Sequence, residues 1–268
     1  MPPRSVRQPT LFIPHGGGPC FFMDWNPPDA WLGLQRFLES LAHTLPAAPD
    51  AVVVVSAHWE AADFTVNTGA NPPLLYDYYG FPAHTYALRY AAPGAPALAG
   101  RVADLLGAAG LSVRSDRTRG FDHGVFIPFK LIFAHAEVPI VQLSLREGLD
   151  PATHLAAGRA LAPLRDDNVL IVGSGMSYHN LRAFGAAGAE AAQRFDGWLR
   201  AAVSQGDVHA RSTALCNWQQ APAARAAHPR EEHLLPLMVA AGAGGDDAGR
   251  IVFNESVLGM PLSACRFG

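Results

Sequence analysis

A run of four valines, in the stretch AVVVVSAHWE at residues 51–60, constrains the fold of this chain more than any other feature. An unbroken apolar run of this length is typical of a strand buried on both faces, as in parallel α/β sheets. The strand is expected at residues 51–56, and His58 follows its end. Ligands of open α/β sheets bind just outside the carboxyl ends of the strands. His58 is therefore a candidate site residue.

Two further apolar stretches end in the same way. TLFIP, at residues 10–14, leads into His15 and three glycines, and NVLIV, at residues 168–172, leads through a glycine turn to His179. Consecutive glycines let the backbone turn sharply and approach a ligand closely. A single histidine at a strand end is most often a hydrogen-bonded structural residue, but three at one edge of a sheet favour a metal site.

Strand-like and helix-like stretches alternate from one end of the chain to the other. Further strands are expected at residues 63–67, 111–114, 138–145, 250–253 and 262–267, and helices at residues 27–45, 93–110, 125–133, 151–165, 189–204 and 234–241. This alternation predicts a single α/β domain over residues 1–268, with a mainly parallel central sheet and helices on both faces.

Residues 71–92 have no helical period and are rich in tyrosine, proline and glycine. We expect a long ordered loop here, and such loops in compact domains are usually functional. Two roles remain open for its aromatic side chains, which either wall a pocket or cap the edge of the sheet. The residues concerned are Tyr76, Tyr78, Tyr79, Phe81 and Tyr86.

Composition argues against several classes of partner. The formal net charge is −3 and Lys130 is the only lysine, which argues against nucleic acid as the main partner. No apolar run reaches the roughly 18 residues that a membrane-spanning helix needs. The cysteines Cys20, Cys216 and Cys265 are odd in number and lack CxxC spacing, so we expect free thiols and a cytoplasmic protein. The sequence does not fix the oligomeric state.

Five histidines stand at or near the ends of the expected elements: His15, His58, His123, His179 and His233. Imidazole ligands suit Zn(II) and non-haem Fe(II). A non-haem iron oxygenase uses three ligands on one face of the ion, so that substrate and dioxygen bind the other face. It also needs a base that titrates near neutral pH. Five histidines are enough for three ligands and two proton-transfer groups.

Two other classes compete with an oxygenase. The HGGG run at residues 15–18 matches the oxyanion loop of α/β-hydrolase esterases, and Ser174 follows a buried strand as their nucleophile does. The nucleophile motif G-x-S-x-G, however, fails at two glycine positions, because residues 172–176 are VGSGM. A non-catalytic zinc-binding or scaffold protein would keep the histidines but would not need the aromatic loop.

Five motifs, in chain order, resemble those of the LigB-like class III extradiol ring-opening dioxygenases, and most of all their DOPA-dioxygenase branch. The motifs are HGGGP at residues 15–19, SAHW at 56–59, GFDHG at 120–124, SYHNL at 177–181 and EHLLPL at 232–237. The stretch YDYYGFPAHTYALRY at 76–90 also resembles that branch. The resemblance covers nearly the whole chain and implies one dioxygenase domain.

Members of this family open a catechol ring beside its two hydroxyls with Fe(II) and dioxygen. The resemblance therefore implies Fe(II) as cofactor, with Zn(II) able to replace it during purification, and a small-molecule catechol such as DOPA as substrate. It implies that His15, His58 and His233 are the metal ligands. His233 stands where the protocatechuate branch of the family has a glutamate, which leaves Glu232 as a less expected ligand.

The resemblance also implies two proton-transfer residues. His179 matches the acid/base histidine of the family, which takes the second phenolic proton. His123, in the GFDHG motif, matches a second pocket histidine that hydrogen-bonds dioxygen or substrate. The chain has HGGGP where many members have HGSP, which changes the local turn around His15 without removing the histidine.

Overall fold

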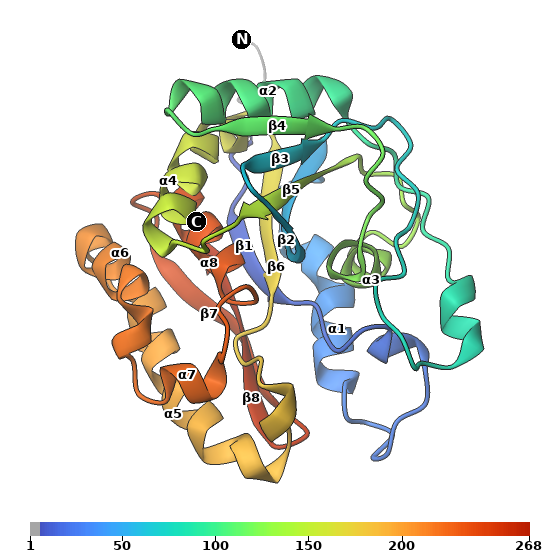
Figure 1. The fold of residues 1–268 in the computed structure, drawn as a ribbon, viewed down its shortest axis with the longest axis vertical. Coiled ribbons are helices and arrows are strands. Elements are labelled where there is room, and N and C mark those ends of the chain that lie inside the picture. Colours follow the sequence, from blue (N-terminus) through green and yellow to red (C-terminus); the bar gives the residue numbers. More distant parts are fainter. Residues whose placement is uncertain (1–5) are drawn as a thin grey trace.

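Four parallel strands form the centre of the protein. In this computed structural model, which describes residues 6–268, they are β1 (Thr10–Pro14), β2 (Ala51–Ala61), β5 (Ile140–Arg146) and β6 (Val169–Gly175) (Figure 1). They lie side by side in the order β5-β2-β6-β1. Nearly all of their side chains are buried, which is why the sequence shows them as unbroken apolar runs.

Further strands extend this centre at both edges to a sheet of eight strands. β3 (Phe64–Asn67) pairs antiparallel with β5 and parallel with β4 (Val113–Asp116). At the other edge β8 (Met260–Phe267) pairs antiparallel with β1 and with β7 (Gly249–Val257). The β7–β8 hairpin turns at two residues of positive φ, as two-residue hairpin loops require. The expected mainly parallel sheet is confirmed, with antiparallel pairing confined to its flanks.

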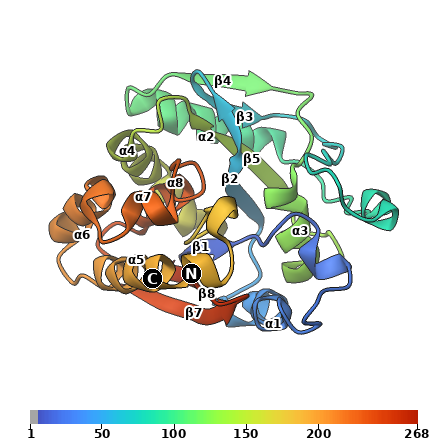
Figure 2. The same cartoon turned by 60° about the horizontal axis from the view of Figure 1, so that its bottom comes forward.

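Helices cover both faces of the sheet, as expected (Figure 2). One face carries α1 (Leu32–Leu41) and α3 (His123–Ile132), and α3 packs on β2 and β6. The opposite face carries α2 (Pro96–Ala108), α4 (Pro151–Leu161), α5 (Ala189–Val203) and α8 (Leu235–Gly244). α8 is buried along its whole length because it packs between the central strands and α4.

One expected helix begins late, and a stretch with no expected element is helical. The helix expected at residues 27–45 begins only at Leu32, because residues 27–31 form successive turns in which Ala30 N–H bonds to Pro27 and Leu32 N–H to Asp29. Residues 208–227, where no helix or strand was expected, contain α6 (Val208–Cys216) and α7 (Ala224–Ala227). The Asp207 side chain caps α6 by accepting two backbone N–H groups, a start signal that the sequence analysis did not use.

Candidate metal centre

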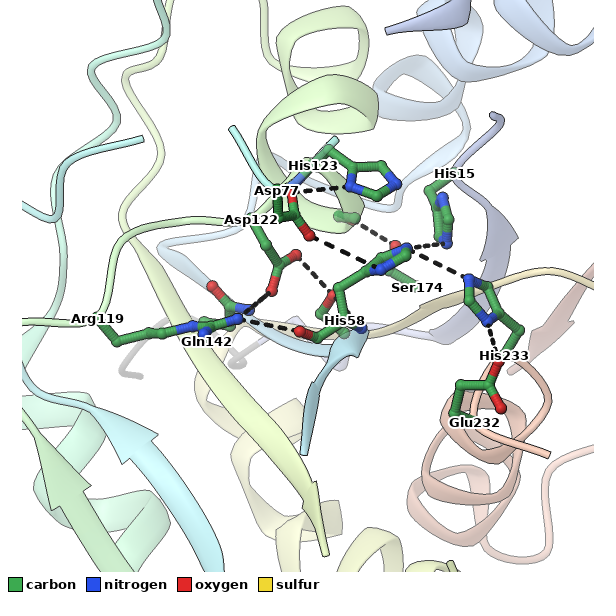
Figure 3. A network of polar contacts seen from close by, with 12 residues as sticks. His15, His58, Asp77, Arg119, Asp122, His123, Gln142, Ser174, Glu232 and His233 are labelled. Atoms are coloured by element: carbon green, nitrogen blue, oxygen red, sulfur yellow. Dashed lines mark hydrogen bonds and ion pairs between the residues drawn. The ribbon is translucent and has the colours of Figure 1, made fainter. Parts of the chain in front are cut away.

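The five candidate histidines lie together at the carboxyl end of the central strands, and Figure 3 shows four of them. Their neighbouring ring centroids are between 3.3 and 5.3 Å apart. They come from five places in the fold: His15 follows β1, His58 lies in β2, His123 opens α3, His179 follows β6 and His233 precedes α8. The topology thus gathers every histidine that the sequence singled out.

Three of these rings direct one nitrogen toward a common point. Nε2 of His58 lies 3.2 Å from Nε2 of His15 and 3.3 Å from Nε2 of His233 (Figure 3). With metal–nitrogen bonds of about 2.1 Å, two ligands stand about 3.0 Å apart at right angles and about 3.4 Å apart at a tetrahedral angle. The spacing of these nitrogens therefore fits one first-row metal ion, such as Fe(II) or Zn(II).

The same three rings are held in the neutral form. Burial, together with the neighbouring histidines, lowers the pKa of His15 and of His58 well below the usual range. Burial also lowers the pKa of His233 to about 4. A neutral imidazole has a lone pair for a metal ion, whereas an imidazolium has none. At neutral pH the three rings can therefore all act as ligands.

Asp77, from the aromatic loop, contacts two of the histidines. Its Oδ1 lies 2.8 Å from Nδ1 of His123 and accepts the backbone N–H of His123 at 2.9 Å, while Oδ2 lies 3.7 Å from Nδ1 of His58. Burial raises the pKa of Asp77, but the hydrogen bonds from His123 outweigh it and the net shift is downward. An ionised Asp77 accepts a hydrogen bond from Nδ1–H of His123, so in the neutral ring the free lone pair is on Nε2.

Glu232 contacts two other histidines of the site, His179 and His233. Its Oε1 lies 2.9 Å from Nδ1 of His233 and 3.3 Å from Nδ1 of His179, whose ring stacks on that of His233 at 3.3 Å. Burial raises the pKa of Glu232, but the hydrogen bonds from His179 and His233 outweigh it and lower the pKa below the usual range. Each carboxylate of the site therefore binds the Nδ1 side of two rings, as outer partners of metal-binding histidines do.

Two other groups of potential ligands overlap the triad. They are His58 with Asp77 and His123, and Glu232 with His179 and His233. In both groups the carboxylate faces Nδ1 nitrogens, which carry protons when they donate to it. The group formed by His15, His58 and His233 differs because it joins three Nε2 atoms. This group is the best suited of the three to hold an ion.

A β-bulge sets the position of His58. The expected strand ended at Ser56, but pairing with β5 shifts register between Val55 and Glu60 and continues to Ala61. Pairing with β6 stops at Ser56. His58 therefore lies in the part of β2 that no longer pairs with β6 and that contains the bulge against β5. Bulges next to functional sites change the direction of side chains.

A buried carboxylate fixes the backbone around this bulge. Asp122 is fully buried and accepts hydrogen bonds from Ser56 at 2.7 Å, from Arg119 at 3.2 Å and from Gln142 (Figure 3). The same Nη2 of Arg119 also donates to the carbonyl oxygen of His58 at 3.0 Å. Burial raises the pKa of Asp122, and the hydrogen bond from Ser56 and the charge of Arg119 oppose that shift.

Two glycines of β6 set the position of His233. A Cβ on Gly175 would lie 2.1 Å from the carbonyl oxygen of His233, and one on Gly173 would lie 2.2 Å from that of Pro236. The backbone of Met176 donates to the same His233 carbonyl at 2.9 Å. Only glycine permits this approach, so the segment before α8 lies directly on the end of β6.

Ser174, between these glycines, has a structural role. It is fully buried, and its hydroxyl donates to the carbonyl oxygen of Gly124 at the start of α3. A serine nucleophile needs a base, usually a histidine, on its hydroxyl. The hydroxyl of Ser174 instead joins β6 to α3, so the esterase interpretation of the HGGG loop lacks its nucleophile and is wrong.

A pocket of about 510 Å³ opens over the histidines. The aromatic loop contributes to its wall, which is one of the two roles left open for that loop. Tyr78, Tyr79 and Phe81 line the pocket. Tyr76 and Tyr86 pack behind Tyr78 against the core, and the hydroxyl of Tyr76 donates to Leu88 at 2.6 Å.

The carboxylates of the site escaped the sequence analysis. Asp77 lies within the aromatic loop with no motif that marks it, and Glu232 stands in the sequence as a less expected ligand beside His233. The signal for Asp77 is slight, because its partner His123 lies 46 residues further along the chain. The signal for Glu232 is its place directly before a candidate ligand, since metal-binding histidines commonly donate their second nitrogen to a carboxylate.

None of the helices within residues 6–268 combines the length and the hydropathy that crossing a bilayer demands. The three cysteines, all within that range, are free thiols, as expected.

Known proteins resemble this chain over nearly its whole length. Residues 9–262 match the family described as the catalytic LigB subunit of aromatic ring-opening dioxygenase. A 4,5-DOPA dioxygenase extradiol from Beta vulgaris is 39% identical over 92% of this chain and 91% of its own. Dioxygenase tasH from Hapsidospora irregularis is 36% identical over 99% and 87%, and a 4,5-DOPA dioxygenase extradiol from Escherichia coli K12 is 36% identical over 89% and 86%.

A solved structure has the same fold. The crystal structure of an uncharacterized protein from Escherichia coli K12 superposes with a TM-score of 0.79 at 31% sequence identity. The superposition covers 98% of this chain and 100% of the other.

Proposed function

The chain belongs to the LigB family and is an extradiol aromatic ring-opening dioxygenase, and on this premise we propose that it opens a substituted catechol with dioxygen, using Fe(II) held by His15, His58 and His233. The observation that carries the ligand assignment is the meeting of three Nε2 atoms at 3.2 and 3.3 Å. When bound, Fe(II) supplies the transfer of electron density from the catecholate to dioxygen. DOPA is the reference substrate because two of the relatives bear its name.

His179 takes a phenolic proton from the substrate in this proposal. The ring lines the pocket, and its Nδ1 lies 3.3 Å from the carboxylate of Glu232. A proton held on Nδ1 by Glu232 leaves the lone pair of Nε2 to accept the proton of the substrate. A histidine oriented by a carboxylate in this way is the usual form of a general base.

His123 serves as the second proton-transfer group. It lines the same pocket, and its ring centroid lies 3.8 Å from that of His58. Asp77 holds its Nδ1 proton at 2.8 Å, so its Nε2 is the atom that hydrogen-bonds the substrate or dioxygen. His123 and His179 thus stand on the two sides of the ligand triad, each with its own carboxylate.

The pocket wall limits the access of water. Trp25, Trp31, Phe81 and Phe184 line the space beside the histidines. Excluding water from such a site strengthens its hydrogen bonds and protects reactive species from side reactions. A non-catalytic zinc-binding protein would need neither this wall nor two histidines outside the ligand triad.

Anaerobic reconstitution tests the proposal. The chelator-treated protein is loaded with Fe(II), mixed with a panel of catechols under nitrogen and then exposed to air. We expect oxygen uptake in equal amount to catechol consumed and a yellow muconic semialdehyde. Protein loaded with Zn(II) is the control and should form no product. Ring opening by metal-free protein, or no turnover of any catechol by protein holding one Fe(II) per chain, would refute the proposed function.

A further inference from the structure

The part of the pocket away from the histidines has no charged side chain. Among residues 6–268, the lining consists of the five histidines, the glycines after His15 and apolar or aromatic side chains, with no Arg, Lys, Asp or Glu. At about 510 Å³ the pocket falls in the range of about 300–1,000 Å³ that is usual for drug-sized ligands. It therefore holds a catechol together with a sizeable substituent.

Two of the four polar side-chain groups in this part of the wall already have partners. Nε1 of Trp25 donates to the carbonyl oxygen of Cys20 at 2.7 Å, and the hydroxyl of Tyr78 donates to that of Thr85 at 2.8 Å. Nε1 of Trp31 is buried without a partner among the described residues. One neutral N–H suits a neutral acceptor on a substrate, but it does not compensate the burial of a carboxylate.

Two exposed side chains, Leu181 and the aromatic ring of Tyr79 with its hydroxyl, present apolar surface at the mouth of the pocket. Tyr79, from the aromatic loop, is 91% exposed, and Leu181, from the loop after β6, is 73% exposed. Both are lining residues. An apolar substituent that reaches the mouth would cover both side chains and gain the free energy of removing their surface from water. A charged substituent would gain nothing from them.

Three arginines beside the site are paired elsewhere or exposed. Arg119 binds Asp122 and the backbone of His58, and Arg230 binds Glu60. Arg182 follows Leu181 in the chain, is exposed and does not line the pocket. The ammonium and carboxylate of an amino-acid side chain such as that of DOPA would therefore meet no ionic partner in the wall.

Resting on the proposed function, we infer that the substrate is a catechol with a neutral, apolar substituent of the aryl or branched-alkyl kind. The diol end lies at the histidines, and the substituent lies along the wall that Trp31 and Phe184 form, reaching Tyr79 and Leu181 at the mouth. DOPA, as a zwitterion, is a poor fit to this wall even though relatives are named for it.

Matched catechols test the inference with two separate measurements. The first is kcat/KM of the Fe(II) enzyme for 4-phenylcatechol, 4-tert-butylcatechol and DOPA. The second is anaerobic binding of the same compounds to the Zn(II)-loaded protein, followed by tryptophan fluorescence, because Trp25 and Trp31 lie in the wall. We expect the neutral compounds to exceed DOPA by at least about tenfold in both measurements. Equal or better binding and turnover of DOPA would overturn the inference.

The two measurements separate this inference from the function on which it rests. Preferential binding of the neutral catechols without any ring opening would support the pocket assignment and refute the dioxygenase proposal for them. Ring opening of DOPA in preference to the neutral catechols would keep the proposed function and refute the inference.

A rim variant provides an independent check. Leu181→Arg places a cation at an exposed position of the mouth, where folding is not at risk, and should shift the ratio of kcat/KM toward DOPA by about tenfold. Arg182→Ala is the control and should leave that ratio unchanged, because its side chain does not line the pocket. Loss of DOPA turnover on Arg182→Ala would show that this arginine binds the carboxylate, and would overturn the inference.

Discussion

Two buried polar clusters lie at opposite ends of the same parallel strands, and they are built in opposite ways. At the amino ends, Arg165 is 1% exposed and donates to Gln8 at 2.7 Å, to Ala243 at 3.0 Å and to the Asp247 carboxylate at 2.6 Å. Each guanidinium nitrogen has an acceptor of the protein. At the carboxyl ends, His58 directs its Nε2 at two other Nε2 atoms.

This difference shows why the cluster around Arg165 is structural and the histidine cluster around His58 is functional. A buried polar group whose partners all belong to the protein is satisfied by the fold alone. Three neutral imidazole nitrogens that meet at one point cannot all be satisfied by hydrogen bonds among themselves, whereas a cation accepts the lone pairs of all three when the ring protons are on Nδ1. Burial and polarity are common to both clusters, so the arrangement of donors and acceptors is what distinguishes them.

The largest effect is expected from the substitution of His58, because its Nε2 atom takes part in both short contacts, with His15 and with His233. His58→Ala should leave the protein folded but with little bound Fe(II) and with nearly all activity lost, because a metal site with one of three protein ligands removed binds its ion far less tightly. Iron content after desalting and oxygen uptake with the best catechol are the measurements. A variant that keeps one tightly bound iron per chain would show that His58 is not a ligand.

Arg165 supplies the matched control from the other cluster. Arg165→Met should leave iron content and kcat unchanged while lowering the free energy of unfolding by roughly 1–3 kcal/mol, because it leaves buried carbonyl oxygens without their donor, whereas the partly exposed Asp247 stays solvated. Urea unfolding at neutral pH measures this. A loss of kcat in the folded variant would mean that the two clusters are not separate in function.

The next effect is expected at His179, the histidine outside the ligand triad. His179→Ala should retain most of its Fe(II) but lose turnover by about 10²–10⁴-fold, as is typical when a positioned general base is removed. Iron content and kcat are measured under the same reconstitution as for His58→Ala. If His179→Ala is iron-free while His58→Ala keeps its ion, then His179 is a ligand and the assigned roles are reversed.

A smaller effect is expected from Glu232, which binds the Nδ1 side of His179 and His233. Glu232→Gln should reduce iron affinity or kcat by about 10–100-fold, the usual range for outer partners of metal-binding histidines. Glu231→Gln is the control, because Glu231 pairs with Arg225 and not with a histidine. Equal activity of Glu232→Gln and the wild type would show that the carboxylate only completes the local packing.

These residues also show how far the sequence could be taken. The histidines were found because each follows or opens a recognisable element, and the elements of an α/β sheet deliver their ends to one edge. Asp77 could not be found in this way, because its role appears only when the loop folds back onto His123. The full length of β2 was missed for a similar reason: residues 57–61 lack alternation, and their pairing depends on a register shift against β5.

The last prediction concerns a buried histidine that the fold satisfies by itself. His154, in α4, is fully buried, its Nδ1 lies 2.8 Å from the carbonyl oxygen of Asp150, and its Nε2 accepts the backbone N–H of Arg146 at 3.2 Å. A backbone N–H only donates, so His154 is neutral with its proton on Nδ1. Burial lowers its pKa to about 4, against the opposing hydrogen bond to Asp150 and the charges of Asp150 and Glu60.

This pKa gives the protein a defined loss of stability in acid. Above about pH 6.5 neither the folded nor the unfolded chain protonates residue 154, so it adds no pH dependence. Between about pH 6.5 and pH 4 the His154 side chain is protonated in the unfolded chain and neutral in the folded chain. The free energy of unfolding therefore decreases by about 1.4 kcal/mol for each unit by which the pH is lowered. Below about pH 4 both states are protonated and this loss stops.

His154→Gln removes the titrating group and should therefore flatten the acid limb of the stability curve. Urea unfolding of the chelator-treated wild type and variant at pH 7.5, 5.5 and 4.5 gives the change of the free energy of unfolding with pH for each protein. Any destabilisation by the substitution that is the same at all three pH values does not affect this slope. We expect the slope between pH 5.5 and 4.5 to be lower in the variant by about 1.4 kcal/mol per unit, with kcat and iron content unchanged at pH 7.5. Identical slopes would mean that His154 is protonated in the folded protein. It would then no longer stand as the satisfied counterpart of the histidines in the pocket.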